Sequence, residues 1–216
     1  MSAPLTIPLS RPTRSDAIAA VMVVLWACGA GLSRSFGIWP AVGLTASTLG
    51  ALAVGLESGA LAEALDAAPS KLLLGLVVGC AMAAATFALF PPVTAVLPGI
   101  RDDVTHLYVA FGRPGLTGIL LLLPVVVACE EIVWRGAVHS ALATHFGWFG
   151  VAILGSILYA LAHAPIGSPA LVLTCLCVGF CWNVLRSWSG SLAAVIVAHL
   201  AWDLAVLVVH PLVAAP

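Results

Sequence analysis

Long apolar runs, separated by short stretches rich in glycine, proline and charged residues, dominate the chain. Most runs approach the roughly 20 residues that an α-helix needs to cross a bilayer. Glycine and proline supply the turns between them. The pattern predicts an all-α, polytopic transmembrane helical bundle of about seven spans, and the length allows six to eight. The predicted spans are residues 17–32, 38–56, 71–90, 116–139, 149–163, 170–185 and 192–209.

One stretch, residues 97–112, breaks this pattern. Arg101, Asp102 and Asp103 make it too polar to span the membrane. We predict a short interfacial helix there.

Composition supports the membrane assignment. The 216 residues are 62% hydrophobic and 8% charged, with a mean hydropathy of +1.15, whereas soluble domains are about 25% charged. The net charge of −1 argues against a nucleic-acid partner. Six cysteines lie in apolar stretches without a Cys-x-x-Cys motif, which indicates buried small hydrophobic residues.

The basic residues at the start of the chain predict the orientation. Arg11 and Arg14 precede the first apolar run, which favours a cytoplasmic N-terminus by the positive-inside rule. We expect this first run to be an uncleaved helix, because bulky Trp26 stands where a cleavage site needs a small residue. The short chain, rich in alanine, valine and glycine, indicates a bacterial cytoplasmic (inner) membrane protein.

Ionisable residues interrupt three of the predicted spans. Each costs roughly 2.5–3.5 kcal/mol at the centre of a membrane helix, so such groups usually face a partner or a water-filled cavity. Together they predict a polar site within the membrane. They are Glu130, Glu131, Arg135, His163, His199 and Asp203.

Their depths along the helices are compatible with one site. At 1.5 Å per residue, Glu130 lies roughly 18 Å from the end of its span at Gly118, and His199 lies roughly 10 Å from Leu192. His163 lies roughly 20 Å from Gly150. We expect all three to border one cavity, open to the cytoplasm.

Spacing assigns different roles to the two adjacent glutamates. Glu131 and Arg135 are four residues apart on one helix face, which suits a carboxylate–guanidinium pair. Glu130 points about 100° away and has no local cation, so it is the candidate general base. The alternative for all three is that they only hold helices together.

The histidines offer two further roles. His163 can share with Glu130 the activation of one water molecule. His199 and Asp203 again lie four apart, and this pair can hold a substrate carbonyl oxygen as it becomes an oxyanion. Structural hydrogen bonds are the alternative for each of these residues.

Two other chemistries stay open. Glu130, His163 and His199 are a possible two-histidine, one-carboxylate zinc site. The zincin motif His-Glu-x-x-His and the Glu-x-x-His motif of di-iron bundles are absent from the chain. We therefore expect a Glu–His dyad without a cofactor, with zinc as the alternative. A nucleophilic Cys129–histidine pair is a further possibility.

Three ordered motifs resemble those of the CPBP family, which includes type II CaaX prenyl endopeptidases and bacterial abortive-infection membrane proteins. The family pattern is Glu-Glu-x-x-x-Arg, then aromatic-x-x-x-His, then His-x-x-x-Asn or Asp. Here it reads Glu130-Glu131…Arg135, Tyr159…His163 and His199…Asp203. The resemblance implies that residues 116–216 form the catalytic helical core. Residues 1–115, which carry no motif, add N-terminal helices and a loop to one integral membrane domain.

The resemblance implies an intramembrane glutamic-type protease. In that scheme Glu130 and His163 activate water, Glu131 and Arg135 support the site, and His199 and Asp203 stabilise the oxyanion. Tyr159 replaces the usual phenylalanine, and Asp203 stands where asparagine is common. An ionised Asp203 cannot donate to an oxyanion, so it is either protonated or orients His199.

The implied substrate is a membrane-embedded peptide or a prenylated C-terminal tail, cleaved near its C-terminus or membrane end. A non-catalytic immunity or scaffold protein that binds a peptide or toxin is the alternative. A small transporter fits less well, because the chain shows no inverted repeat.

Overall fold

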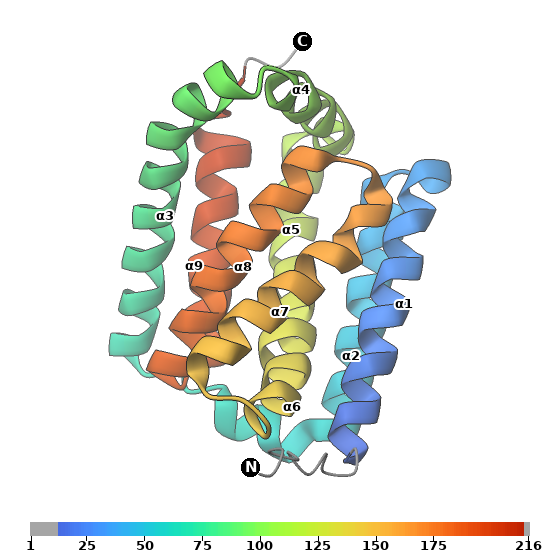
Figure 1. The fold of residues 1–216 in the computed structure, drawn as a ribbon, viewed down its shortest axis with the longest axis vertical. Coiled ribbons are helices and arrows are strands. Elements are labelled where there is room, and N and C mark those ends of the chain that lie inside the picture. The colour runs from blue at the N-terminus through green and yellow to red at the C-terminus, as the bar shows by residue number, and fades with distance from the viewer. Residues whose placement is uncertain (1–12, 214–216) are drawn as a thin grey trace, which may run out of the picture.

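The computed structural model describes residues 13–213, and this part of the chain is helical without a β-strand (Figure 1). Two π-helical segments and one 3-10 turn lie among the α-helices. The α-helices are α1 (Arg14–Phe36), α2 (Ile38–Ala64), α3 (Pro69–Val96), α4 (Gly99–Gly112), α5 (Gly115–Glu131), α6 (His139–Ala143), α7 (Trp148–His163), α8 (Pro169–Ser189) and α9 (Leu192–Asp203). The other segments are η1 (Ile132–Val138), η2 (Ala164–Ile166) and η3 (Leu204–Val209).

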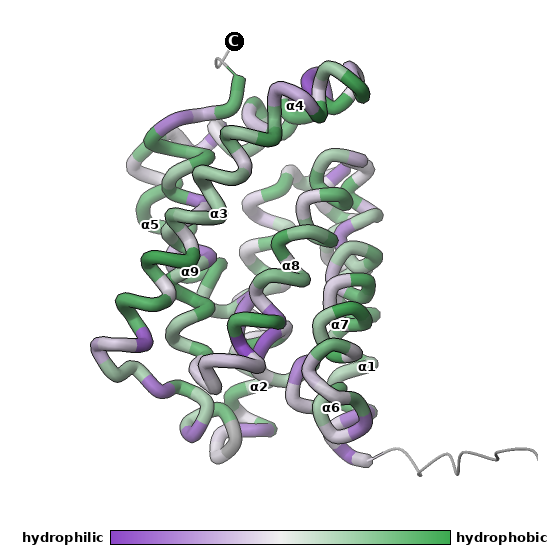
Figure 2. The backbone as a smooth tube through the Cα atoms, turned by 60° about the vertical axis from the view of Figure 1, so that its left-hand side comes forward, coloured by the Kyte–Doolittle hydropathy of each residue, from purple (hydrophilic) through white to green (hydrophobic). Residues whose placement is uncertain are grey.

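Seven helical stretches of the described residues are long and apolar enough to cross a membrane, which confirms the predicted polytopic bundle. The last of them, Leu192–Val209, has the predicted bounds. Figure 2 shows hydrophobic residues along most of their length. Many of their large apolar side chains are exposed on the surface of the protein. Such exposure suits contact with lipid rather than water. Examples are Val24, Leu44, Leu73, Leu121 and Leu161.

The predicted helix within residues 97–112 is α4, which begins at Gly99. It lies across one end of the bundle, between the ends of α3 and α5 (Figure 1). Hydrogen bonds tie it to its neighbours: Trp39 Nε1 donates to the carbonyl of Phe111, and Tyr108 Oη donates to that of Val206. Burial raises the pKa of Tyr108, so the phenol stays neutral and keeps its hydrogen.

The described basic residues do not favour either orientation. Arg14, Lys71 and Arg186 lie at the end of the bundle where α1 begins. The opposite end holds three more, Arg34, Arg101 and Arg113. Arg11, on which the predicted orientation also depends, lies outside the described residues. The cytoplasmic N-terminus stays a prediction.

Small residues bring α3 and α9 into close contact. A Cβ atom added to Gly75 would lie 2.2 Å from the carbonyl oxygen of Ala194, and one added to Gly79 would lie 2.4 Å from that of Ala198. Glycine at every fourth position lets two membrane helices approach closely. This contact fixes α9, the helix that carries His199.

Candidate active site

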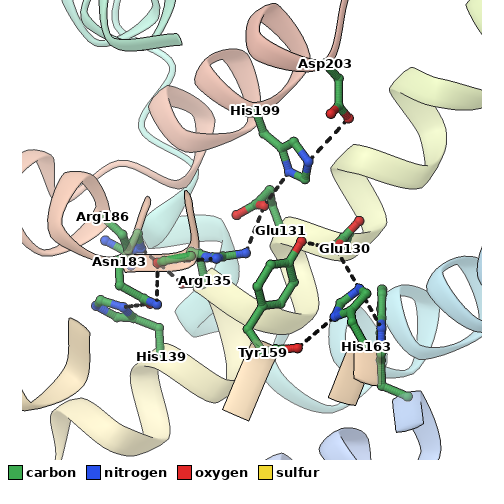
Figure 3. A network of polar contacts seen from close by, with 12 residues as sticks. Glu130, Glu131, Arg135, His139, Tyr159, His163, Asn183, Arg186, His199 and Asp203 are labelled. Atoms are coloured by element: carbon green, nitrogen blue, oxygen red, sulfur yellow. Dashed lines mark hydrogen bonds and ion pairs between the residues drawn. The ribbon is translucent and has the colours of Figure 1, made fainter. Parts of the chain in front are cut away.

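The six predicted site residues lie together in the interior of the bundle (Figure 3). Each is buried, with at most 8% of its surface exposed. Glu130 and Glu131 end α5, His163 ends α7, and Asp203 ends α9 one turn after His199. Arg135 lies in η1. Residues far apart in sequence are therefore brought into one cluster.

A cavity of about 170 Å³ borders this cluster. Glu130, His163 and His199 line it, as expected from their depths along the helices, and so does Asp203. Glu131 and Arg135 are not among its lining residues and have no exposed surface. The remaining lining is mostly apolar and extends to Val104, Leu107, Tyr108 and Phe111 of α4.

Glu130 is held by two neighbours on α7. Tyr159 Oη donates a hydrogen bond to Glu130 Oε1 over 2.5 Å, and His163 Nε2 lies 3.5 Å from the same oxygen (Figure 3). Tyr159 and His163 are one helical turn apart, so both reach the same carboxylate. Both contacts are made to Oε1. Among residues 13–213, Oε2 has no hydrogen-bond partner.

Both ring nitrogens of His163 have partners. Nδ1 lies 2.8 Å from the carbonyl oxygen of Tyr159, and Trp26 Nε1 donates to Nε2 over 3.1 Å. The motifs did not indicate Trp26, which comes from α1. The long sequence separation between Trp26 and His163 left no local pattern by which to find it.

Glu131 forms the predicted pair with Arg135 and also contacts α9. Arg135 Nη1 lies 3.1 Å from Glu131 Oε1, and His199 Nδ1 lies 2.7 Å from the same oxygen. Glu131 is therefore bonded within its own helix and across to α9. A buried charge is tolerated when it is paired and hydrogen-bonded in this way.

His199 lies between two carboxylates. Its Nδ1 faces Glu131, and its Nε2 lies 3.3 Å from Asp203 Oδ2. The indole of Trp182 stacks on the imidazole, with ring centroids 3.9 Å apart and an interplanar angle of 28°. The ring of His199 is thus fixed on both edges and on one face.

Aromatic rings surround the Arg135 guanidinium. Its Cζ lies 4.4 Å from the centre of the Tyr159 ring and 5.1 Å from that of Trp182. A cation over an aromatic face is stabilised, most strongly where water is excluded. Arg135 therefore links the residue that holds Glu130 to the ring that stacks on His199.

The predicted span over residues 116–139 lies within one helical stretch, Gly115–Ala143, whose helix type changes along its length. The structure divides this stretch into α5, the π-helical segment η1 and the start of α6. The motif His199…Asp203 is also followed by a π-helical segment, since η3 begins at Leu204. π-Helical turns within α-helices often occur at functional sites.

Cys129, the candidate nucleophile, and Cys175 lie differently with respect to the cavity. Cys129 packs against α2, since a Cβ added to Gly50 would lie 2.9 Å from the Cys129 Cβ, and Cys129 does not line the cavity. Cys175 of α8 does line it, together with His163. The alternative of a Cys129–histidine nucleophile finds no support in this arrangement.

For the zinc alternative, the donor atoms are already engaged. The nitrogens of His163 and His199 contact protein groups, as described above. Among residues 13–213, no group of three histidine, cysteine, aspartate or glutamate side chains is arranged as a metal-ligand set.

The fold and the site together define a class: an integral membrane protein whose helices enclose a buried cluster of glutamate, histidine, aspartate and arginine. Residues 113–205 match the family model described as Type II CAAX prenyl endopeptidase Rce1-like. This match contains all six site residues and confirms the resemblance that the motifs indicate. No curated protein and no solved structure matches the chain significantly.

Proposed function

We propose that this protein is an intramembrane endopeptidase that hydrolyses a peptide bond with a water activated by Glu130 and His163. The observation that carries the proposal is a buried carboxylate beside an imidazole on the wall of a cavity, with 3.5 Å between Glu130 Oε1 and His163 Nε2. The match of residues 113–205 to an endopeptidase family supports the same reaction.

Glu130 is the proposed general base. Its Oε1 is occupied by Tyr159, which leaves Oε2 for the water. The water oxygen bonds to the carbonyl carbon of the substrate while a proton passes to Glu130. The same proton then goes to the amide nitrogen as the C–N bond breaks. His163, whose Nε2 lies 3.5 Å from Glu130 Oε1, borders the same space and helps to position the water there.

His199 is the proposed donor to the oxyanion. Two carboxylates and one guanidinium surround it, so a hydrogen on both ring nitrogens balances the charge of the group Glu131, Arg135, His199 and Asp203. In this state Nε2–H lies 3.3 Å from Asp203 Oδ2 beside the cavity, and we propose that the oxyanion of the bound substrate replaces Asp203 in this long contact. Of the two roles open to Asp203, this favours orienting His199 over donating to the oxyanion itself.

Glu131 and Arg135, which do not line the cavity, are proposed to support the site by holding His199 in place. Glu131 accepts from Nδ1 of His199, and the Arg135 guanidinium compensates its charge. No cofactor takes part in this scheme. Preorganised groups of this kind stabilise developing charge without rearranging during the reaction.

The substrate is proposed to be a membrane-embedded peptide or a prenylated C-terminal tail. The apolar lining between Glu130 and α4 suits a hydrophobic segment next to the scissile bond. The setting is proposed to be a bacterial inner membrane, and the proposed reaction there is maturation of small peptides or cleavage of C-terminal sorting signals.

The test uses the full chain in lipid vesicles with a panel of membrane peptides, including farnesylated C-terminal peptides. Glu130→Gln removes the base at constant volume and is expected to lower cleavage at least a hundredfold. Glu63→Gln, at an exposed position of α2, is the matched control. Full activity of Glu130→Gln contradicts the proposal.

Two further arms separate the alternatives. Loss of activity with a zinc chelator, restored by zinc, favours the metal site. Tight binding of one peptide without cleavage by the unmodified protein favours the non-catalytic binding protein.

A further inference from the structure

The indole of Trp26 reaches the site from α1, outside the segment that matches the family model. Trp26 is 1% exposed, and its Nε1–H donates to His163 Nε2 over 3.1 Å. Its ring packs edge-on against Trp134 of η1, with centroids 5.7 Å apart. A helix in which we found no motif thus completes the surroundings of His163.

The two hydrogen bonds of His163 specify one tautomer. The carbonyl oxygen of Tyr159 only accepts, so Nδ1, 2.8 Å away, carries a hydrogen. The indole N–H of Trp26 only donates, so Nε2 must offer its lone pair. The imidazole that satisfies both partners is neutral, with its hydrogen on Nδ1 and none on Nε2.

Glu130 competes with Trp26 for this nitrogen. Glu130 Oε1 lies 3.5 Å from His163 Nε2, and Nε2 needs a hydrogen to bond with that carboxylate. One ring nitrogen cannot accept from Trp26 and donate to Glu130 at the same time. If Nε2 carried a hydrogen, the buried indole N–H would lose its acceptor, which is costly. Trp26 therefore favours a bare Nε2.

We propose that Trp26 is a positioning residue that keeps Nε2 of His163 free of hydrogen, so that His163 does not donate to Glu130 and the carboxylate stays free to take a proton from the reacting water. This inference rests on the proposed function, in which His163 and Glu130 act on one water. Trp26 acts through His163. It ties the first helix of the bundle, through one hydrogen bond, to the chemistry of the segment that follows.

The first experiment reads the tautomer directly. Nitrogen-15 NMR of histidine-labelled protein, with the His163 signals assigned through His163→Gln, is expected to show a protonated Nδ1 and a bare Nε2. Trp26→Phe keeps an aromatic ring but removes the donor, and we expect a substantial fraction of His163 to carry hydrogen on Nε2. Trp188→Phe, at an exposed position of α8, is the matched control and leaves the spectrum unchanged.

The second experiment measures kcat and KM for a peptide that the native protein cleaves. Trp26→Phe is expected to lower kcat about tenfold with KM unchanged, which is the effect of losing one hydrogen bond. If Trp26→Phe does not fold, 3-benzothienylalanine at position 26 replaces only the N–H by sulfur. A variant that keeps the tautomer of the native protein overturns the proposal, whatever its kcat.

The two proposals fail in different ways. If Glu130→Gln remains active but Trp26→Phe changes the tautomer, the hydrolytic scheme is wrong and the role of Trp26 at His163 stands. If Glu130→Gln is inactive but Trp26→Phe changes neither the tautomer of His163 nor kcat, the hydrolytic scheme stands and the proposed role of Trp26 is wrong.

Discussion

Glu131 Oε1 lies 2.7 Å from Nδ1 of His199, and the same oxygen binds Nη1 of Arg135 at 3.1 Å. One carboxylate oxygen thus connects α5, η1 and α9. All three side chains are nearly or fully inaccessible, so the carboxylate charge has no solvent to replace a lost partner. The orientation of His199 and the stability of the bundle therefore depend on the same group.

Glu131→Gln is expected to destabilise the protein by about 3–5 kcal/mol, because it leaves the buried Arg135 guanidinium without its counter-charge. We expect cleavage to fall with it, since His199 loses its charged acceptor. The free energy of unfolding in mixed detergent micelles measures the first effect, and kcat in vesicles measures the second.

A double-mutant cycle is the control for this prediction. Arg135→Met in the Glu131→Gln background removes the uncompensated charge and should recover part of the lost stability. If the two destabilisations simply add, the pair does not contribute as described.

The sequence predicts contacts within the candidate site where its signals are local or depend on depth. Four-residue spacing places Glu131 near Arg135 and His199 near Asp203, and both contacts are found. Rise per residue predicts that Glu130 borders the same cavity as the histidines, and it does. Apolar runs predict the seven spans because lipid excludes polar residues from them.

What the sequence does not predict depends on contacts between distant helices. Trp26 belongs to an ordinary apolar run, and nothing in its neighbourhood points to His163 on α7. The stacking of Trp182 on His199 is likewise a contact between two helices that no local pattern indicates. The π-helical segments η1 and η3 have no counterpart in the hydrophobic pattern, which predicts a helix without distinguishing its type.

Tyr159→Phe removes the donor to Glu130 while keeping the ring that Arg135 contacts. We expect kcat to fall two- to tenfold, as for the loss of one hydrogen bond of about 0.5–1.5 kcal/mol. Stability should change little because the packing is retained. Steady-state cleavage and a thermal melt check both statements. A loss of a hundredfold or more would mean that Tyr159 takes part in the chemistry itself.

Cys175 provides a test of the cavity. A small, membrane-permeant methanethiosulfonate is expected to inactivate the protein by filling the space next to His163, because Cys175 lines that space. Cys175→Ala should protect against the reagent. Cys129→Ala should not, because Cys129 packs against α2 instead. Equal protection by both variants would contradict the assigned positions.

Gly79→Ala tests whether close packing of α3 positions the site. The new Cβ would lie 2.4 Å from the Ala198 carbonyl oxygen, so α9 must move or the helices separate. Overpacking of this kind costs about 1–3 kcal/mol, and a shifted His199 should lower kcat. Gly55→Ala is the matched control on α2, where an added Cβ meets nothing within 4 Å. If both variants behave like the native protein, α9 does not depend on α3 for its position.

Asp203→Asn separates the two roles left open for this residue. If Asp203 orients His199 by accepting a hydrogen bond from Nε2, the amide oxygen of asparagine can accept the same bond. We therefore expect Asp203→Asn to keep at least about a tenth of the native kcat, and Asp203→Ala, which offers no acceptor, to lose about a further tenfold. The asparagine variant also removes one negative charge beside His199, so any loss that it shows should appear in kcat rather than KM. An asparagine variant as inactive as the alanine variant would mean that the aspartate works through its charge or its own proton, not as an acceptor.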